Sequence, residues 1–112
     1  MCLFCKIAAK QIPSKVLFED DDLLAFHDIN PAAPTHLLVI PKQHLTSLDH
    51  ALPEHAALLG KLMLAAQRAA QLTGLAPDGW RLVVNTGANA GQSVHHLHLH
   101  VLGGRSLAWP PG

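Results

Sequence analysis

The sequence predicts an α+β fold, an antiparallel meander sheet of about five strands with one main helix packed against it. Three observations lead to this prediction. Several short apolar runs are bounded by proline, glycine or aspartate, as is typical of strands. One longer stretch, 53–73, repeats its apolar residues at helical spacing. The length of 112 residues, with 49% hydrophobic content, suits a single domain spanning 1–112.

The N-terminal half divides into short elements separated by turn residues. We expect a helical turn at 4–10 and strands at 16–19, 23–28 and 36–40. Pro13 ends the helical turn, and the acidic turn 20–22 separates the first two strands. The apolar run 36–40 is short enough to be a buried strand, and Pro41 closes it.

The C-terminal half contains the one long helix. The helix has an apolar stripe along one face, because its apolar residues recur three or four positions apart. These residues are Leu58, Leu62, Ala66 and Ala69. Pro53 suits a first helical turn, and Gly74 suits the position just past the end. Strands are expected at 80–85 and 93–102, joined by a glycine-rich loop at 86–92. The tail 109–112 contains two prolines and is expected to be neither helix nor central strand.

The strand predicted at 93–102 carries alternating histidines. Successive side chains of a strand point to opposite faces, so His96, His98 and His100 are expected on one face, roughly 6.6 Å apart. The intervening apolar residues would face the core. Imidazole can be a nucleophile, a proton carrier or a metal ligand near neutral pH. Three in alternation directly after a glycine-rich loop therefore indicate a catalytic or ligand-binding site.

The glycine-rich loop favours a phosphate ligand. Its glycines let the backbone approach an anion, and the Ser93 hydroxyl can donate to phosphate oxygens. Asp28 ends an apolar strand, where its carboxylate could accept hydrogen bonds from ribose hydroxyls. Taken alone, Asp28 is better explained as a turn-capping aspartate before Asn30 and Pro31.

Two cysteines stand near the start of the chain as Cys2-x-x-Cys5. Zinc takes four nitrogen or sulfur ligands, so histidines would have to complete any site. The spacing matches no zinc finger. A metal site, a redox pair and two inert thiols all remain open on this evidence.

Charge and hydropathy limit the partners. Eight Lys and Arg balance eight Asp and Glu, so the basic surface that binds nucleic acid is absent. No apolar run approaches a membrane span, and the start of the chain lacks a signal-peptide layout. The expectation is a cytoplasmic protein with neither nucleic-acid nor membrane partners.

The segment Gly91–Arg105 (GQSVHHLHLHVLGGR) resembles the His-x-His-x-His signature of the histidine triad (HIT) family, and its Hint branch in particular. Further matching segments follow the family order, namely Phe26–Ile29, Ala33–His36, Val39–Lys42 and Trp109–Gly112. The resemblance implies a single HIT domain with a HIT-like fold, assembled as a homodimer. It also implies a hydrolase for purine nucleoside phosphoramidates of the adenosine 5′-monophosphoramidate type.

The resemblance also implies a role for each matching residue. His98 would be the nucleophile that becomes nucleotidylated, and His36 would belong to the histidine relay behind it. His100 and Ser93 would contact the phosphate, with His96 completing the catalytic set. The remaining nucleotide-binding positions would be Phe26, His27, Asp28, Ile29, Asn85 and Gln92.

Some family members bind structural zinc, and the matching positions here are Cys2, Cys5, His44 and His96. Two alternatives to the phosphoramidase remain. One is a diadenosine polyphosphate hydrolase of the Fhit type, and the other is a non-catalytic, zinc-stabilised nucleotide-binding or scaffold protein. The loop after Asn85 lacks the acidic residues of some members, and His95 stands where an aromatic residue is common. The preferred leaving group therefore stays open.

Overall fold

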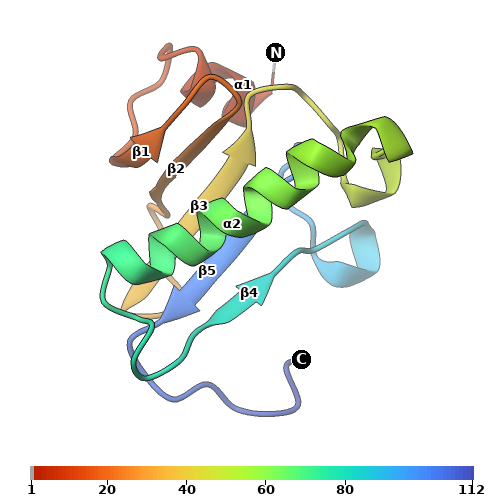
Figure 1. Ribbon diagram of the computed structural model, residues 1–112. Helices are drawn as coiled ribbons and strands as arrows, with labels where there is room; N and C mark the ends of the chain where they lie inside the picture. Colours follow the sequence, from red (N-terminus) through yellow and green to blue (C-terminus); the bar gives the residue numbers. More distant parts are fainter. Residues whose placement is uncertain (1) are drawn as a thin grey trace.

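The computed structural model describes residues 2–112. Its centre is a five-stranded sheet in the order β1-β2-β3-β5-β4, with every neighbouring pair antiparallel. The strands are β1 (Val16–Glu19), β2 (Leu23–His27), β3 (Thr35–Pro41), β4 (Arg81–Val83) and β5 (Leu99–Gly103). The chain forms a meander from β1 to β3, and β5 then lies between β3 and β4 (Figure 1). The predicted fold class is confirmed.

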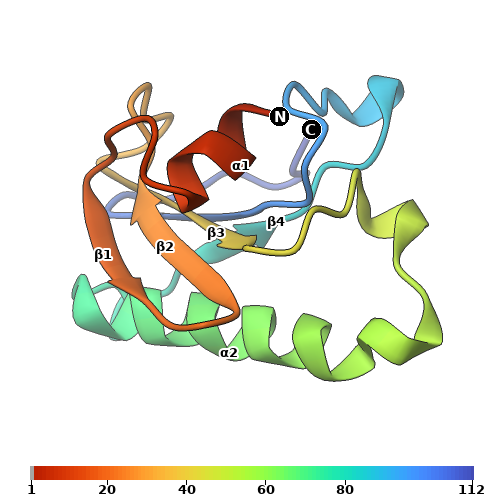
Figure 2. The ribbon, with the colours of Figure 1, turned by 90° about the horizontal axis from the view of Figure 1, so that it is seen from above.

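Two α-helices cover opposite faces of the sheet. Helix α1 (Leu3–Ala8) lies on one face and α2 (Ala56–Leu72) lies along the other (Figure 2). Three short 3₁₀ turns complete the structure, at Leu48–His50, Pro53–His55 and Ala88–Ala90. The helix predicted from Pro53 thus begins as a 3₁₀ turn and becomes α-helical at Ala56, and Pro53 lies in the first turn, where proline is tolerated. No helix in the described part of the chain is long and apolar enough to cross a membrane.

The α2 face of the sheet holds the larger apolar core. Leu62, Ala66 and Ala69 of α2 are fully buried, as the predicted stripe requires. They pack with the side chains that β3 and β5 turn toward the helix, including Val39 and Val101. The small alanines let α2 approach the sheet closely, so this face is filled by aliphatic side chains.

The α1 face holds a second, smaller core. Phe4 and Ile7 of α1 are buried against Phe26, Leu38 and Ile40 of the sheet. The Phe4 and Phe26 rings meet edge to face, with centroids 5.7 Å apart. This cluster fixes α1 beside β2 and β3.

One predicted strand starts later than expected. The histidine strand was predicted at 93–102, but β5 begins at Leu99. Residues 93–98 are anchored by other contacts instead of the sheet ladder: the Leu97 N–H donates to the Leu45 carbonyl, and His96 donates to the Pro41 carbonyl. The alternation of faces still holds, because Leu97 and Leu99 join the α2 core while His98 and Phe4 stack on the α1 side. Strand β4 is likewise shorter than the predicted 80–85.

Candidate functional site

A cavity of about 600 Å³ opens on the α1 face of the sheet. Seven of the residues expected to contact a nucleotide or its phosphate line it: Phe26, His27, Asp28, Ile29, Ser93, His98 and His100. Most of the lining surface is apolar, and the polar groups gather where β2 ends and β5 begins. An apolar cleft with a few convergent polar groups is the usual form of a small-molecule site.

His98 is held in one ring orientation. Its Nδ1 lies 2.7 Å from the backbone carbonyl oxygen of His96. A carbonyl only accepts, so the neutral ring carries its proton on Nδ1 and leaves a lone pair on Nε2. The ring is 4% exposed, and Phe4 stacks on it edge to face at 5.1 Å. His98 is therefore a buried, oriented imidazole with an available nucleophilic nitrogen.

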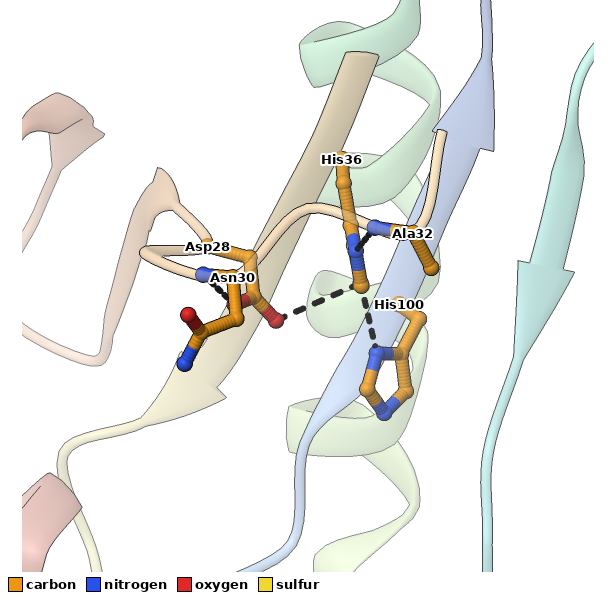
Figure 3. A network of polar contacts seen from close by, with 5 residues as sticks. All are labelled: Asp28, Asn30, Ala32, His36 and His100. Atoms are coloured by element: carbon orange, nitrogen blue, oxygen red, sulfur yellow. Dashed lines mark hydrogen bonds and ion pairs between the residues drawn. The ribbon is translucent and has the colours of Figure 1, made fainter. Parts of the chain in front are cut away.

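Behind His98, three polar side chains form a chain of contacts (Figure 3). The Ala32 N–H donates to His36 Nδ1 at 3.0 Å, so a neutral His36 carries its proton on Nε2. His36 Nε2 lies 2.9 Å from His100 Nδ1 and 3.4 Å from an oxygen of Asp28. His36 thus donates to His100, and His100 in turn carries its proton on Nε2.

The N–H group at His100 Nε2 is available to donate a hydrogen bond to a ligand. This nitrogen is buried, and it has no hydrogen-bond partner within residues 2–112. His100 lines the cavity, and its ring centroid lies 4.9 Å from that of His98. Buried donors are normally satisfied, so an oxygen of a bound molecule is a fitting partner for this N–H.

Burial keeps His36 and His100 neutral. Burial, together with the neighbouring His98 and His36, lowers the pKa of His100 to about 4, although Asp28 opposes the shift. Burial also lowers the pKa of His36, although Asp28 opposes the shift. The 3.4 Å contact between His36 Nε2 and the Asp28 carboxylate is therefore not an ion pair at pH 7, where the tautomers assigned to His36 and His100 apply.

The two carboxylate oxygens of Asp28 contact different residues. One carboxylate oxygen accepts a hydrogen bond from the Asn30 N–H at 2.8 Å, which is the turn-capping contact weighed from sequence. The other oxygen faces His36 Nε2. Because Asp28 also lines the cavity, the turn contact and a ligand contact are compatible.

Two of the predicted nucleotide residues do not line the cavity. Gln92 accepts a hydrogen bond from the Gly87 N–H and donates to the Thr46 and Val94 carbonyls, so it closes the glycine-rich loop on itself. Asn85 is half-buried on the segment after β4 and lies outside the cavity lining. Ser93 is exposed at the cavity edge.

Sequence reasoning missed the N-terminal wall of the cavity. Residues from α1 and the loop after it line it as well, namely Leu3, Phe4, Ile7, Ile12, Pro13, Ser14 and Lys15. The apolar spacing of Phe4 and Ile7 was the available signal, since it predicts a buried helix face. No local pattern in the sequence predicts that this helix face packs against the histidine segment, residues 95–100.

The second cluster lies next to the first and consists of Cys2, Cys5, His44 and His96. The two Sγ and two Nδ1 atoms are 3.2 to 3.5 Å apart in all six pairs. A point equidistant from such atoms lies about 2.0–2.1 Å from each, which is the length of a zinc–nitrogen bond and slightly short of a zinc–sulfur bond.

The donor set also suits zinc chemically. His96 Nε2 donates to the Pro41 carbonyl at 2.8 Å, which leaves the Nδ1 lone pair for a metal. Thiolate and imidazole are the ligands that zinc prefers, and four protein ligands in a tetrahedron leave no open position. The residues present therefore fit a structural zinc ion.

Comparisons with known proteins agree with this arrangement. A sequence model of the family described as "HIT domain" matches residues 9–107. The chain belongs to the HIT family. Protein HitA of Neisseria gonorrhoeae is 55% identical over 102 residues, covering 91% of this chain and 94% of that protein. The solved HIT family hydrolase of Legionella pneumophila has a TM-score of 0.98 at 50% identity, and the match covers 100% of both chains.

A plant HIT-family relative is similar over nearly the whole chain. The 14 kDa zinc-binding protein of Zea mays is 51% identical over 112 residues, covering 98% of this chain and 87% of that protein. Together with the solved structures, these relatives establish the HIT fold of the domain.

Proposed function

We propose that this protein is a nucleotide hydrolase that cleaves purine nucleoside phosphoramidates, of the adenosine 5′-monophosphoramidate type, through a nucleotidyl-His98 intermediate. The observation that carries the proposal is the His98 ring, whose Nδ1 is bound to the His96 carbonyl and whose Nε2 lone pair is free to attack. The solved relative described as a HIT family hydrolase supports a hydrolase.

The proposed reaction has two displacements at phosphorus. His98 Nε2 forms a bond to the α-phosphorus while the phosphorus–nitrogen bond breaks, and the leaving amine takes up a proton. Water then attacks the same phosphorus, the bond to His98 breaks, and AMP leaves. The covalent step divides one difficult displacement into two easier ones, since imidazole is both a good nucleophile and a tolerable leaving group.

The cavity supplies partners for each part of the substrate. Under the proposal, His100 Nε2–H and Ser93 donate to the phosphate oxygens, where negative charge develops. Asp28 accepts from the ribose hydroxyls, while Phe26, His27 and Ile29 surround the base. Gln92 supports Ser93 by holding the preceding loop.

The proposal includes zinc and a homodimer. Zinc held by Cys2, Cys5, His44 and His96 would stabilise the fold and take no part in the chemistry. For the homodimer, β4 is an edge strand whose outer side could pair with a second copy. Met63 and Leu64 of α2 are 54% and 66% exposed, so they offer adjacent apolar surface for contact with a second copy. Light scattering that gives twice the chain mass of 12.0 kDa would support the dimer.

The deciding experiment is AMP release from adenosine 5′-phosphoramidate, measured for the wild type, His98→Ala and His95→Ala. We expect His98→Ala to lose activity by about 10³-fold or more while still binding AMP. His95 is exposed and outside the cavity lining, so its alanine variant is the matched control and should keep activity.

Two other outcomes would contradict the proposal. Cleavage of diadenosine polyphosphate, with none of the phosphoramidate, would favour the Fhit-type hydrolase. AMP binding without release of product from either substrate would favour a nucleotide-binding or scaffold protein.

A further inference from the structure

The nucleotide cavity and the cysteine cluster share a short stretch of chain. His96 contributes its Nδ1 to the cluster, and its carbonyl oxygen fixes the ring of His98. Phe4 of α1 lies between Cys2 and Cys5 in the sequence, and its side chain lines the cavity. The two sites are therefore neighbours that contact each other through His96 and Phe4.

Phe4 is the residue that connects them most directly. Its side chain is buried, and its ring meets His96 and His98 edge to face at 5.9 and 5.1 Å. The same ring meets Phe26, another wall of the cavity. The position of Phe4 therefore sets the shape of the cavity where an apolar ligand group would pack.

Helix α1 is too short to hold Phe4 in place alone. It has six residues, whereas isolated helices below about 12–15 residues are marginal in water. Its first turn is closed by the cluster itself, because Cys2 Sγ accepts a hydrogen bond from the Cys5 N–H at 3.2 Å. Cys2 and Cys5 are joined in the cluster to His44 from the loop after β3 and to His96. Whatever occupies the cluster thus fixes α1 against the histidine segment.

We propose that Cys2, Cys5, His44 and His96 are positioning residues for the nucleotide. Zinc held by them fixes α1, and through Phe4 it fixes the cavity wall against which the base packs. Metal occupancy then sets nucleotide affinity as well as fold stability. This inference rests on the proposed function, because it takes a purine nucleotide as the ligand of the cavity.

The effect of metal loss is local under this proposal. The larger core lies on the opposite face of the sheet, where Leu62, Ala66 and Ala69 of α2 are fully buried far from the cysteines in sequence. Loss of the metal would loosen α1 and leave the sheet and α2 folded.

The test is a double-mutant cycle on AMP affinity, measured by calorimetry with metal content recorded on each sample. The proteins are the zinc-loaded wild type, Cys5→Ser, Phe4→Ala and the double variant. We expect Cys5→Ser to lose zinc and bind AMP about 10-fold more weakly, and Phe4→Ala to keep zinc and also bind more weakly. The double variant should bind no more weakly than Phe4→Ala, because the metal acts through that ring.

Two controls keep the test decisive. Zinc is also removed from the wild type with a chelator and then restored, so the result does not depend on the folding of Cys5→Ser. Leu62→Ala destabilises the α2 core without touching α1, and it should lower the melting temperature while leaving AMP affinity unchanged.

Three results would overturn the inference. One is metal-free protein that binds AMP as tightly as the zinc-loaded form, and another is a Cys5→Ser effect of equal size with and without Phe4. The third is loss of most of the helical circular dichroism signal on zinc removal, since α1 has only six residues, α2 has 17, and the proposed effect is confined to α1. By contrast, zinc-loaded wild type that fails to bind AMP would contradict the proposed function itself.

Discussion

The two faces of the sheet differ in what their buried side chains can do. The α2 face is closed by aliphatic residues such as Leu62 and Val101. The α1 face contains the buried histidines His36, His96 and His98. It also holds the cavity and the cysteine cluster. One face therefore supplies apolar burial, and the other supplies oriented polar groups.

The difference teaches how a small domain can place several imidazoles in its interior. Burying polar groups costs free energy unless they are hydrogen-bonded, and here His96 and His98 each bind a backbone carbonyl. His36 is held by a backbone N–H and by His100. The α2 core supplies the apolar burial that stabilises the domain, so the α1 face can be specialised. We therefore expect substitutions on the α1 face to lower activity and substitutions on the α2 face to lower stability.

After the nucleophile His98 itself, the largest effect is expected at His36. Replacing it by Phe keeps a flat buried ring but removes the donor that fixes the His100 tautomer. We expect kcat to fall by about 10²- to 10³-fold, or roughly 3–4 kcal/mol in the barrier, with KM changed little. Steady-state kinetics on adenosine 5′-phosphoramidate measure this. The exposed His50 provides the control His50→Phe, and an equal loss there would remove the assigned role.

The opposite result is expected for Leu62→Ala. Leu62 is fully buried in the α2 core, so its truncation leaves a cavity and should cost about 3 kcal/mol of unfolding free energy. Denaturant titration measures the loss, and kcat of the folded variant should stay within about twofold of the wild type. A large drop in kcat without unfolding would show that the two faces are coupled.

The third prediction concerns acid. The pKa of His100 is about 4 in the folded protein, below the ordinary histidine value of 6.5 that applies to the unfolded chain. Between these values the unfolded state binds more protons, so stability is full above about pH 6.5 and falls as the pH drops toward 4. We expect a loss of about 2 kcal/mol, after discounting for solvent screening, from this one group.

Denaturant titrations of metal-stripped protein at pH 7 and pH 4.5 measure the effect, since stripping removes competition between protons and metal. His100→Asn is the matched variant and should flatten the pH dependence. His36 and His96 contribute in the same direction, because burial lowers the pKa of both. An unchanged slope in His100→Asn would contradict the assigned pKa.

The smallest effect is expected at the margin of the α2 face. The Arg68 guanidinium lies over the Phe18 ring, 4.3 Å from its centroid. Arg68→Ala should cost about 0.5–1 kcal/mol of unfolding free energy, and Arg68→Lys should recover part of it. Thermal unfolding of the three proteins measures this. Equal stability of all three proteins would contradict a stabilising contact between Arg68 and the Phe18 ring.

The sequence was enough to predict the fold class and the division of the histidine segment between two faces. Both depend on periodicity, which is local: the alanine and leucine stripe of α2 and the alternation from His96 to Val101 can each be read within one short stretch of sequence. The motif order also predicted the HIT family, which the comparisons confirmed.

The exact start of the histidine strand could not be predicted from this pattern. Residues 93–98 have the composition of a strand, yet their partners are the carbonyls of Pro41, at the end of β3, and of Leu45, in the loop that follows. A hydrogen bond to a residue so far away in sequence leaves no periodic trace.

The site shows the same division between local and distant information. The sequence by itself determined which residue types are present and which of them share a face, because these follow from side-chain chemistry and from the two-residue period of a strand. Only the tertiary structure decided that Cys2 lies 3.2 Å from His96 Nδ1, that Phe4 forms a wall of the cavity, and which ring nitrogen of His98 is free. These depend on contacts between residues up to 94 positions apart, which are set when all elements pack together.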